Sequence, residues 1–229
     1  MRTPSGRAAY DRLAPIIVGA HYDTVVESPG ADDNASALAV LLEVAYQLRR
    51  SPLERPVWLV AFCLEEQGLL GSTAFAARLK KAKRSIGGAI ILECVGFASR
   101  TEGSQQTPPG IPIAVPGKGD FLAVIGNEAS RELIAAIEQS AAGSVPRLKT
   151  LGLAVPGRGE LLPDTRRSDH AAFWDAGFPA VMLTDTANYR NPHYHRRSDT
   201  VDTLDIPFLE KVIDTVIISI KTMAGTQDK

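Results

Sequence analysis

Side chains that bind hard divalent cations recur along this 229-residue chain, and each lies at the end of an apolar run. In chain order they are His21, Asp33, the adjacent pair Glu65 and Glu66, Glu93 and His195. A zinc site uses His nitrogen and carboxylate oxygen, about four ligands per metal, and keeps one position open when it is catalytic. The set supplies enough ligands for two such sites and one additional carboxylate, Glu65, which a hydrolase needs as a general base.

The candidates His21 and Asp33 each have a structural explanation that needs no metal when each is considered alone. In an extended His21-x-Asp23 both side chains point to the same side, so Asp23 can accept the second ring N–H of a metal-bound His21. The same pattern also fits the polar start of a loop. Asp32 and Asp33 precede a predicted helix, where one acidic residue is explained as an N-cap or as a complement to the helix dipole. Two adjacent aspartates after Gly30 are not explained by an N-cap or by the helix dipole.

The glutamates are harder to explain without a cation. Glu65 and Glu66 follow the most hydrophobic predicted strand, with no Lys or Arg nearby in the sequence, and adjacent carboxylates at a buried strand end repel each other. The alternative is an exposed loop pair. Glu93 lies within AIILECVGF, where a charge is rarely tolerated unless it is paired or metal-bound. Its alternative is a strand-end carboxylate that accepts backbone N–H groups.

The three histidines of the C-terminal half divide into ligand candidates and a structural residue. His193 and His195 flank Tyr194 in NPHYHRRSDT, on the same side of an extended chain, and a polar loop is the alternative reading. His170, in RSDHAAFW, is predicted to begin a helix and to make structural hydrogen bonds. Residue types alone do not place the candidates together in space.

The elements that must position these residues follow an alternating pattern. Short apolar runs alternate with helical periodicity, which predicts an α/β fold with a largely parallel sheet. Strands are predicted at 16–20, 57–63, 88–95, 121–125 and 180–184, all as continuous apolar runs typical of buried central strands. Helices are predicted at 35–49, 71–80, 128–142, 169–176 and 207–223. The Gly- and Pro-rich segments 99–119 and 155–167 are predicted to be loops, which at this length are usually functional lids or disordered.

Composition narrows the class of protein. With 45% hydrophobic and 22% charged residues, 1–229 is expected to form a single soluble globular domain. The net charge of -1 gives no case for nucleic-acid or membrane-surface binding, and no apolar stretch approaches the about 18–20 residues of a membrane span. Residues 1–15 contain no apolar core of a secretory signal, and the sequence selects no compartment. Cys63 and Cys94 are predicted to be unbridged.

Six ordered motifs resemble the co-catalytic zinc aminopeptidase family (peptidase clan MH), which includes bacterial leucyl aminopeptidase, the glutamate carboxypeptidase II group and glutaminyl cyclase. They are GAHYDT, PGADDNAS, EEQGLLGS, ILECV, RSDHAAFWDAGFPAVML and NPHYHRRSDTVDTLD, from about residue 15 to residue 205. The resemblance implies a three-layer α/β/α sandwich with a mixed, mainly parallel central sheet, the phosphorylase/hydrolase-like zinc peptidase fold. It also implies that this chain lacks the helix and strand that usually precede the first motif.

The resemblance further implies two Zn²⁺ ions and a role for each site residue. One ion would be held by His21 and Glu93, the other by Glu66 and His195, and Asp33 would bridge both. Glu65 would be the general base, and Asp23 would orient His21. In the closing motif the ligand His stands four residues before Asp199, which selects His195 and not His193. A cis peptide bond between Asp33 and Asn34 is also expected from the resemblance.

The function that the resemblance favours is a zinc-dependent exopeptidase, an aminopeptidase that removes N-terminal residues from a peptide substrate through a metal-bridging water. One alternative is a single-zinc glutaminyl-peptide cyclase, and another is a carboxypeptidase in which Arg166 and Arg167 bind a substrate carboxylate. A third is a non-enzymatic binding module, which predicts eroded ligand positions. The two arginines stand where the family carries cysteines, so side-chain preference is not implied, nor is oligomeric state. Family members are often secreted or periplasmic.

Overall fold

The computed structural model describes residues 10, 12–144 and 147–225, and these form a six-stranded sheet between two layers of helices. The strands are β1 (Ile16–His21), β2 (Val57–Phe62), β3 (Gly88–Glu93), β4 (Leu122–Asn127), β5 (Thr150–Val155) and β6 (Ala180–Thr184). Their order across the sheet is β2-β1-β3-β6-β4-β5. Neighbouring strands are parallel except β4 and β6, so the mixed, mainly parallel sheet is confirmed.

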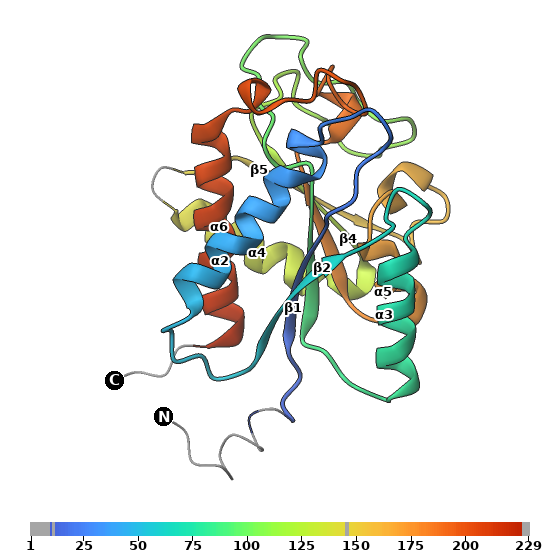
Figure 1. Ribbon diagram of the computed structural model, residues 1–229, viewed down its shortest axis with the longest axis vertical. Helices are drawn as coiled ribbons and strands as arrows, with labels where there is room; N and C mark the ends of the chain where they lie inside the picture. The colour runs from blue at the N-terminus through green and yellow to red at the C-terminus, as the bar shows by residue number, and fades with distance from the viewer. Residues whose placement is uncertain (1–9, 11, 145–146, 226–229) are drawn as a thin grey trace.

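Helices cover both faces of the sheet, as the three-layer expectation required (Figure 1). One face carries α2 (Ala37–Leu48), α4 (Arg131–Gly143) and α6 (Ile206–Ala224), and the other carries α3 (Leu70–Lys81) and α5 (His170–Ala176). Each layer encloses its own hydrophobic cluster against the sheet. In α6, Asp205 caps the helix by accepting the Phe208 N–H at 2.9 Å. Within the described ranges, no helix combines the length and the apolar character that crossing a membrane requires.

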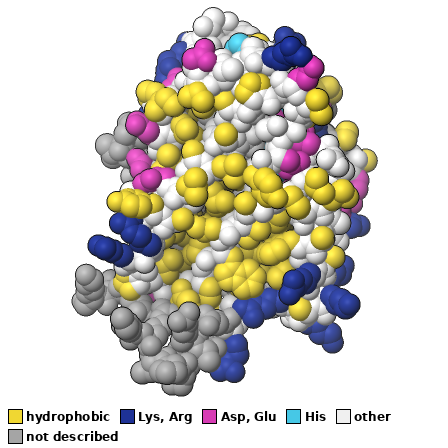
Figure 2. All heavy atoms as spheres, in the orientation of Figure 1, with side chains coloured by type: hydrophobic (Ala, Val, Ile, Leu, Met, Phe, Trp, Pro, Cys, Tyr) yellow, Lys and Arg dark blue, Asp and Glu magenta, His cyan; other side chains and the backbone are white. Residues whose placement is uncertain are grey.

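Two expectations about strands were wrong. Strand β5 was not predicted, because its residues are only partly buried and Gly152 interrupts the apolar run, which hides an edge strand. It takes Val155 from the segment expected to be a loop. Strand β2 was expected to be central, yet it lies at the opposite edge of the sheet, and Leu59 is 37% exposed. Figure 2 shows hydrophobic side chains gathered on the face of the molecule where this edge of the sheet lies.

The remaining expectation about the N-terminal region falls mainly on residues outside the described ranges. Residues 1–9 and 11 are among those that precede the first motif, and the helix and strand implied to be missing there are not addressed by the structure. The first described strand residue is Ile16, in β1.

Parallel pairing brings the predicted ligands to one edge of the sheet. The β1–β3 register sets Gly19 opposite Ile91, and two residues further along each strand it brings His21 beside Glu93. The β1–β2 register sets His21 opposite Phe62, three residues before Glu65. Because the carboxyl ends of parallel strands lie at the same edge, the side chains that end these strands converge there.

The α3/α5 face is covered unevenly. Helix α5 packs against β3 and β6, whereas β4 and β5 receive α4 on the other face. On the α5 side the irregular segment 99–119 lies over the β4–β5 end of the sheet, and its Ile111 and Ile113 pack against the core there. The segment is closed at its base by a bridge between Ser99 and Gly119. A loop rather than a helix therefore covers this part of the sheet.

Candidate metal centre

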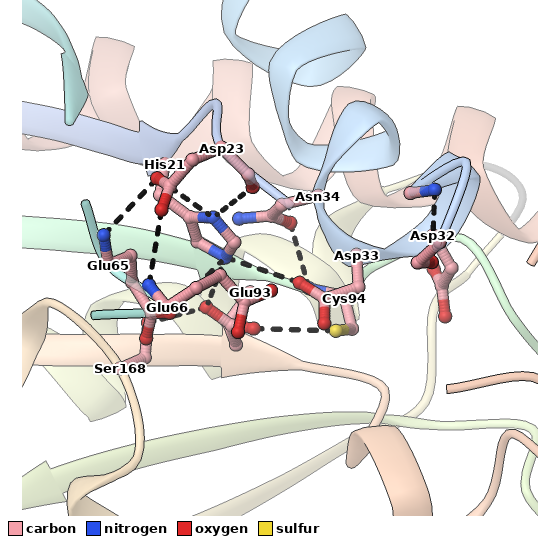
Figure 3. A network of polar contacts seen from close by, with 12 residues as sticks. His21, Asp23, Asp32, Asp33, Asn34, Glu65, Glu66, Glu93, Cys94 and Ser168 are labelled. Carbon is pink, nitrogen blue, oxygen red and sulfur yellow. Dashed lines mark hydrogen bonds and ion pairs between the residues drawn. The ribbon is translucent and has the colours of Figure 1, made fainter. Parts of the chain in front are cut away.

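The first ligand group is buried at the ends of β1 and β3. His21 is fully buried, and its Nε2 lies 3.3 Å from Asp33 Oδ1 and 3.3 Å from Glu93 Oε2. Its Nδ1 lies 3.0 Å from the backbone carbonyl of Asp23, which can only accept, so Nδ1 carries the proton. Figure 3 shows Nε2 directed toward the two carboxylates. His21, Asp33 and Glu93 thus present three ligand atoms to one point.

The second ligand group shares Asp33 with the first. His195 Nε2 lies 3.0 Å from Asp33 Oδ2 and 3.3 Å from Glu66 Oε2. One oxygen of Asp33 therefore faces the first group and the other faces the second. This group is nearer the surface, since the side chain of His195 is 35% exposed whereas that of His21 is buried. Asp33 is therefore the one residue that belongs to both ligand groups among the described residues.

The donor set fits divalent metal ions by three separate observations. Ligand atoms at 3.3 Å are too far apart for good hydrogen bonds, but a tetrahedral ion with bonds of about 2.0–2.1 Å separates its ligands by roughly that distance. His21 Nε2, Asp33 Oδ1 and Glu66 Oε1 are buried without a hydrogen-bond partner. Among the described residues, no Lys or Arg forms an ion pair with the carboxylates of the centre, which are Asp23, Asp33, Glu65, Glu66 and Glu93.

The electrostatics of the protein atoms alone show uncompensated negative charge. Burial and the carboxylate of Glu93 raise the pKa of Glu65 to about 9. Burial and Asp33 raise the pKa of Glu66 to about 7. Burial lowers the pKa of His21, but Glu93 and Asp33 outweigh it and raise the value to about 12. A bound cation would compensate the same carboxylates, and zinc or a similar ion is the compensation that His and carboxylate ligands select.

Asp33 is aimed by an irregular turn, η1 (Ala31–Ser36), between β1 and α2. Gly30 enters it with φ of 69°, and a Cβ there would lie 2.2 Å from Thr24 Cγ2, so the turn requires glycine. Asp33 and Asn34 leave helical geometry, and the expected cis peptide bond between them is present. Asp199 accepts the backbone N–H groups of Asp32 at 2.9 Å and of Asp33 at 3.2 Å.

The amide of Asn34 ties this turn to the strand that carries Glu93. Its Nδ2 donates to the Leu92 carbonyl and its Oδ1 accepts the Cys94 N–H, both at 3.0 Å. The two bonds bracket Glu93, so the carboxylates of Asp33 and Glu93 are held by one connected network. Asp32 does not cap the helix; it accepts the Gly96 N–H at 2.8 Å instead.

Asp23 is placed differently from the sequence-based expectation. Its carboxylate is 3.8 Å from His21 Nδ1, and the ring bonds the Asp23 backbone carbonyl instead. The carboxylate accepts the N–H groups of Glu65 and Glu66, both at 3.2 Å. The physical reason is that these consecutive N–H groups, left unpaired by the turn after β2, present two donors to one carboxylate. Asp23 therefore positions the glutamate pair.

Glu65 lies beside the first ligand group without belonging to either group. Its Oε2 is 4.0 Å from His21 Nε2, and the residue is 9% exposed. Glu66 points instead toward His195. The two adjacent carboxylates, in the turn after β2, thus face different parts of the centre.

Several contributing residues were not singled out from the sequence. Ser168 donates to Glu93 Oε2 at 2.6 Å, and Asp169 beside it is fully buried. Tyr194 stacks on His195 with ring centroids 3.8 Å apart. Ser168 and Asp169 lie within the RSDH motif, which was the available signal for them. The alternative proposed for Glu93, acceptance of backbone N–H groups, is not what the structure shows.

The remaining histidines and cysteines lie outside both ligand groups. His193 Nδ1 lies 3.0 Å from Ser198 Oγ, outside both ligand groups. His170 begins α5, is buried, and bonds the Thr165 carbonyl through Nε2 at 2.7 Å, as expected for a structural histidine. Cys63 and Cys94 are both free, which confirms the prediction.

The chain resembles known proteins in family, sequence and structure. The model of Peptidase family M28 matches residues 5–220. The uncharacterized protein YfbL of Escherichia coli (strain K12) is 37% identical over an alignment of 220 residues that covers 88% of this chain and 65% of YfbL.

The fold is similar to those of solved aminopeptidase structures. BSAP, a zinc aminopeptidase from Bacillus subtilis, superposes with a TM-score of 0.69 at 27% identity, over 91% of this chain and 46% of that one. The LapA aminopeptidase of Legionella pneumophila superposes with a TM-score of 0.73 at 19% identity, over 95% and 52%, which supports the fold. This chain therefore spans less than two thirds of the length of each of these proteins.

Proposed function

Because the chain belongs to peptidase family M28, we propose that it is a zinc-dependent aminopeptidase that removes the N-terminal residue from a peptide substrate. The observation that carries the proposal is the carboxylate of Asp33, whose two oxygens face two separate ligand groups. A carboxylate in that position would be shared by the two metal ions of a two-metal hydrolase. The similarity to BSAP, a zinc aminopeptidase, supports this choice of reaction.

The ligand atoms would hold two Zn²⁺ ions in unequal surroundings. His21 and Glu93 would hold the buried ion, and Glu66 and His195 the more exposed one, with Asp33 shared between them. When bound, zinc supplies a Lewis acid that polarises a carbonyl and lowers the pKa of water. The Nδ1 proton of His21, held by the Asp23 carbonyl, leaves Nε2 as the free donor atom.

Glu65 would act as the general base. It lies next to the ligand groups without being one of the ligands, and its backbone is held by Asp23. In this role its carboxylate takes a proton from the water that attacks the scissile carbonyl and passes it to the leaving amine. With cations bound nearby, the carboxylate of Glu65 would stay ionised, in opposition to the burial that raises its pKa.

The test is a panel of substrates that differ in one end group. Leucyl-p-nitroanilide and a C-terminally amidated peptide with a free N-terminus should both be hydrolysed by the zinc-loaded protein, whereas an N-acetylated peptide with a free C-terminus should resist. Cleavage of the acetylated but not the amidated peptide would establish a carboxypeptidase instead. A glutaminyl peptide should lose its first residue; loss of ammonia with retention of that residue would establish a cyclase.

A further inference from the structure

The outer edge of strand β2 is open among the described residues, since its backbone pairs there only with β1. On the inner side, the carbonyl of Phe62 accepts the Tyr22 N–H at 3.0 Å, directly after β1. Backbone groups alternate in direction along a strand, so those of every second residue point away from β1. The outward-facing residues are Val57, Leu59 and Ala61.

The two edges of the sheet differ in how they are protected. Edge strands of native proteins usually carry a charge, a proline, a bulge or a cover that blocks pairing with another chain. At the β5 edge, Glu138 Oε1 accepts the Gly152 N–H at 2.9 Å, so a charged side chain occupies the position of a further strand. Strand β2 reads VWLVAF and contains no charged residue, proline or glycine. The β2 edge is therefore able to accept another strand.

Helix α2 adds an apolar stripe beside this edge. Its inner side is buried against the sheet by Ala37, Val40, Leu41 and Val44. Apolar residues also recur at helical spacing on the outer side, where Leu42 is 71% exposed and Tyr46 is 57% exposed. The full outer stripe is Ala35, Ala39, Leu42 and Tyr46. A helix that is apolar on opposite sides is typical of a buried helix, so the outer stripe lacks its cover.

The strand and the stripe form one apolar surface. In the view of Figures 1 and 2, β1 and β2 lie in front, α2 lies on one side and α3 on the other. Figure 2 shows hydrophobic side chains gathered between these two helices, and α2 contacts β2. Contiguous exposed apolar patches of this kind mark interaction sites. We name this surface the edge face; it consists of residues 57–61 with Ala35, Ala39, Leu42 and Tyr46.

The charges around the edge face favour one direction for the partner. Helices α2 and α3 both end at the level where β2 begins (Figure 1). The residues at these helix ends are basic: Arg49, Arg50, Arg78, Lys80, Lys81 and Lys83. The other end of β2 leads into the carboxylates of Glu65 and Glu66. A second copy aligned parallel would set two basic ends together, whereas an antiparallel copy sets each basic end beside an acidic one.

We propose that the edge face binds a second copy of this chain, with the two β2 strands paired antiparallel about a two-fold axis at Leu59. In this register Leu59 lies opposite the partner subunit's Leu59, and Val57 lies opposite the partner subunit's Ala61. The outward backbone groups of the two strands then satisfy one another. The axis is perpendicular to the sheet, so both α2 helices lie on the same side, where their outer stripes cover each other. The surface is self-complementary, as a two-fold dimer requires.

Self-association provides the first test and does not depend on the proposed function. Light scattering after gel filtration should give twice the 24.5 kDa of one chain, at about 1 to 100 µM protein. Leu59→Lys sets two like charges opposite each other at the axis and should raise the dissociation constant roughly 100-fold or more. The control is Leu161→Lys, at a residue that is 87% exposed outside the edge face, and it should remain dimeric. A wild-type chain that stays monomeric, or a Leu59→Lys variant that stays dimeric, would overturn the inference.

A second variant tests the edge face without altering the sheet. Leu42 lies on the outer side of α2, so Leu42→Lys leaves the hydrophobic clusters of the fold intact. Circular dichroism and denaturant unfolding verify the fold of each variant, and Leu42→Lys decides the matter if Leu59→Lys does not fold. We expect its dissociation constant to rise at least roughly tenfold, because two lysines replace apolar contacts across the axis. Dimerisation as tight as that of the wild type would contradict the proposed interface.

The register is tested by single cysteines in a Cys63→Ser background, which removes the half-buried native thiol. Opposed residues of a hydrogen-bonded antiparallel pair have Cα atoms about 5.5 Å apart, within the range of a disulfide. Leu59→Cys should therefore form a covalent dimer under mild oxidation. Val57→Cys is the matched control and should not, because four residues, about 13 Å, separate the two copies of that position. A dimer without the Leu59→Cys cross-link, or with the Val57→Cys cross-link in its place, would overturn the two-fold pairing at Leu59.

Discussion

Asp199 lies behind Asp33 and determines where its carboxylate points. The buried carboxylate of Asp199 accepts the Asp33 N–H at 3.2 Å and the preceding N–H, of Asp32, at 2.9 Å. Asp23 does the same for the other acidic pair, by accepting the N–H groups of Glu65 and Glu66. Two carboxylates outside the ligand groups thus position the backbone of two candidate ligands and the candidate base.

Removal of the Asp199 charge should loosen the shared carboxylate. In Asp199→Asn an NH₂ group replaces one carboxylate oxygen. Because this group cannot accept a hydrogen bond, a buried backbone N–H loses its partner at a cost of about 1–3 kcal/mol. We expect the free energy of unfolding to fall by that amount and the affinity for both zinc ions to decrease, since Asp33 faces both groups. Denaturant titration and zinc competition measure the two effects. Asp202→Asn, at an exposed position nearby, is the control, and equal behaviour of the two variants would contradict the role of Asp199.

Asp23→Asn should act on one metal rather than two. Its carboxylate bonds the glutamate pair, whereas His21 bonds the Asp23 backbone, which the substitution retains. We expect zinc affinity of the Glu66 group to fall roughly 10- to 100-fold, with little change for the His21 group. Zinc titration of the variant, with Glu27→Gln on the same loop as control, distinguishes the two. Selective loss of the His21 ion would show instead that Asp23 acts through His21.

Glu65→Gln should separate the base from the ligands. The substitution keeps the size of the side chain and removes its ability to accept a proton, so kcat should fall roughly 10²- to 10⁴-fold. Zinc content and KM should be retained, because Glu65 lies outside both ligand groups. The companion variant Glu66→Gln should lose the more exposed ion. If Glu65→Gln lost a zinc ion or kept near-normal turnover, the roles of the two glutamates would be wrong.

Much of the site was predictable because the residue types themselves indicate metal binding. Glu93 ends an apolar strand, and a carboxylate in that setting already indicated a compensating cation. Side chains that act on the backbone left no comparable signal. Asp199 and Asp23 bond N–H groups of residues 166 and 42 positions away, respectively, and every residue except proline offers such a donor.

The fold was predictable where strands are buried and less so at the edges of the sheet. β3 and β6 read as apolar runs because helices cover both of their faces. β5 is only partly buried and contains Gly152, so its pattern resembles a loop. The apolar run of β2 does not reveal which strands lie beside it, because strand order depends on the connections and not on composition.

His170 should make stability depend on pH. Burial lowers its pKa to about 4, below the about 6.5 of an unfolded histidine. The unfolded chain therefore binds a proton first as the pH falls, so the contribution is fully present above about pH 6.5 and is lost down to about pH 4. Between about pH 7.5 and pH 5 the loss should be about 2 kcal/mol. His170→Gln should lack this component in denaturant titrations at the two pH values; parallel pH profiles would contradict the assignment.

The central claim is that Asp33 joins two metal sites, and zinc stoichiometry tests it most directly. Native mass spectrometry of the protein after zinc loading and dialysis should find two Zn²⁺ ions per chain, with the Glu66–His195 ion the first to be lost because His195 is 35% exposed. Asp33→Ala should retain neither ion, whereas Glu66→Ala should retain one. A wild-type protein that saturates at one ion per chain would contradict the account and favour a mononuclear centre.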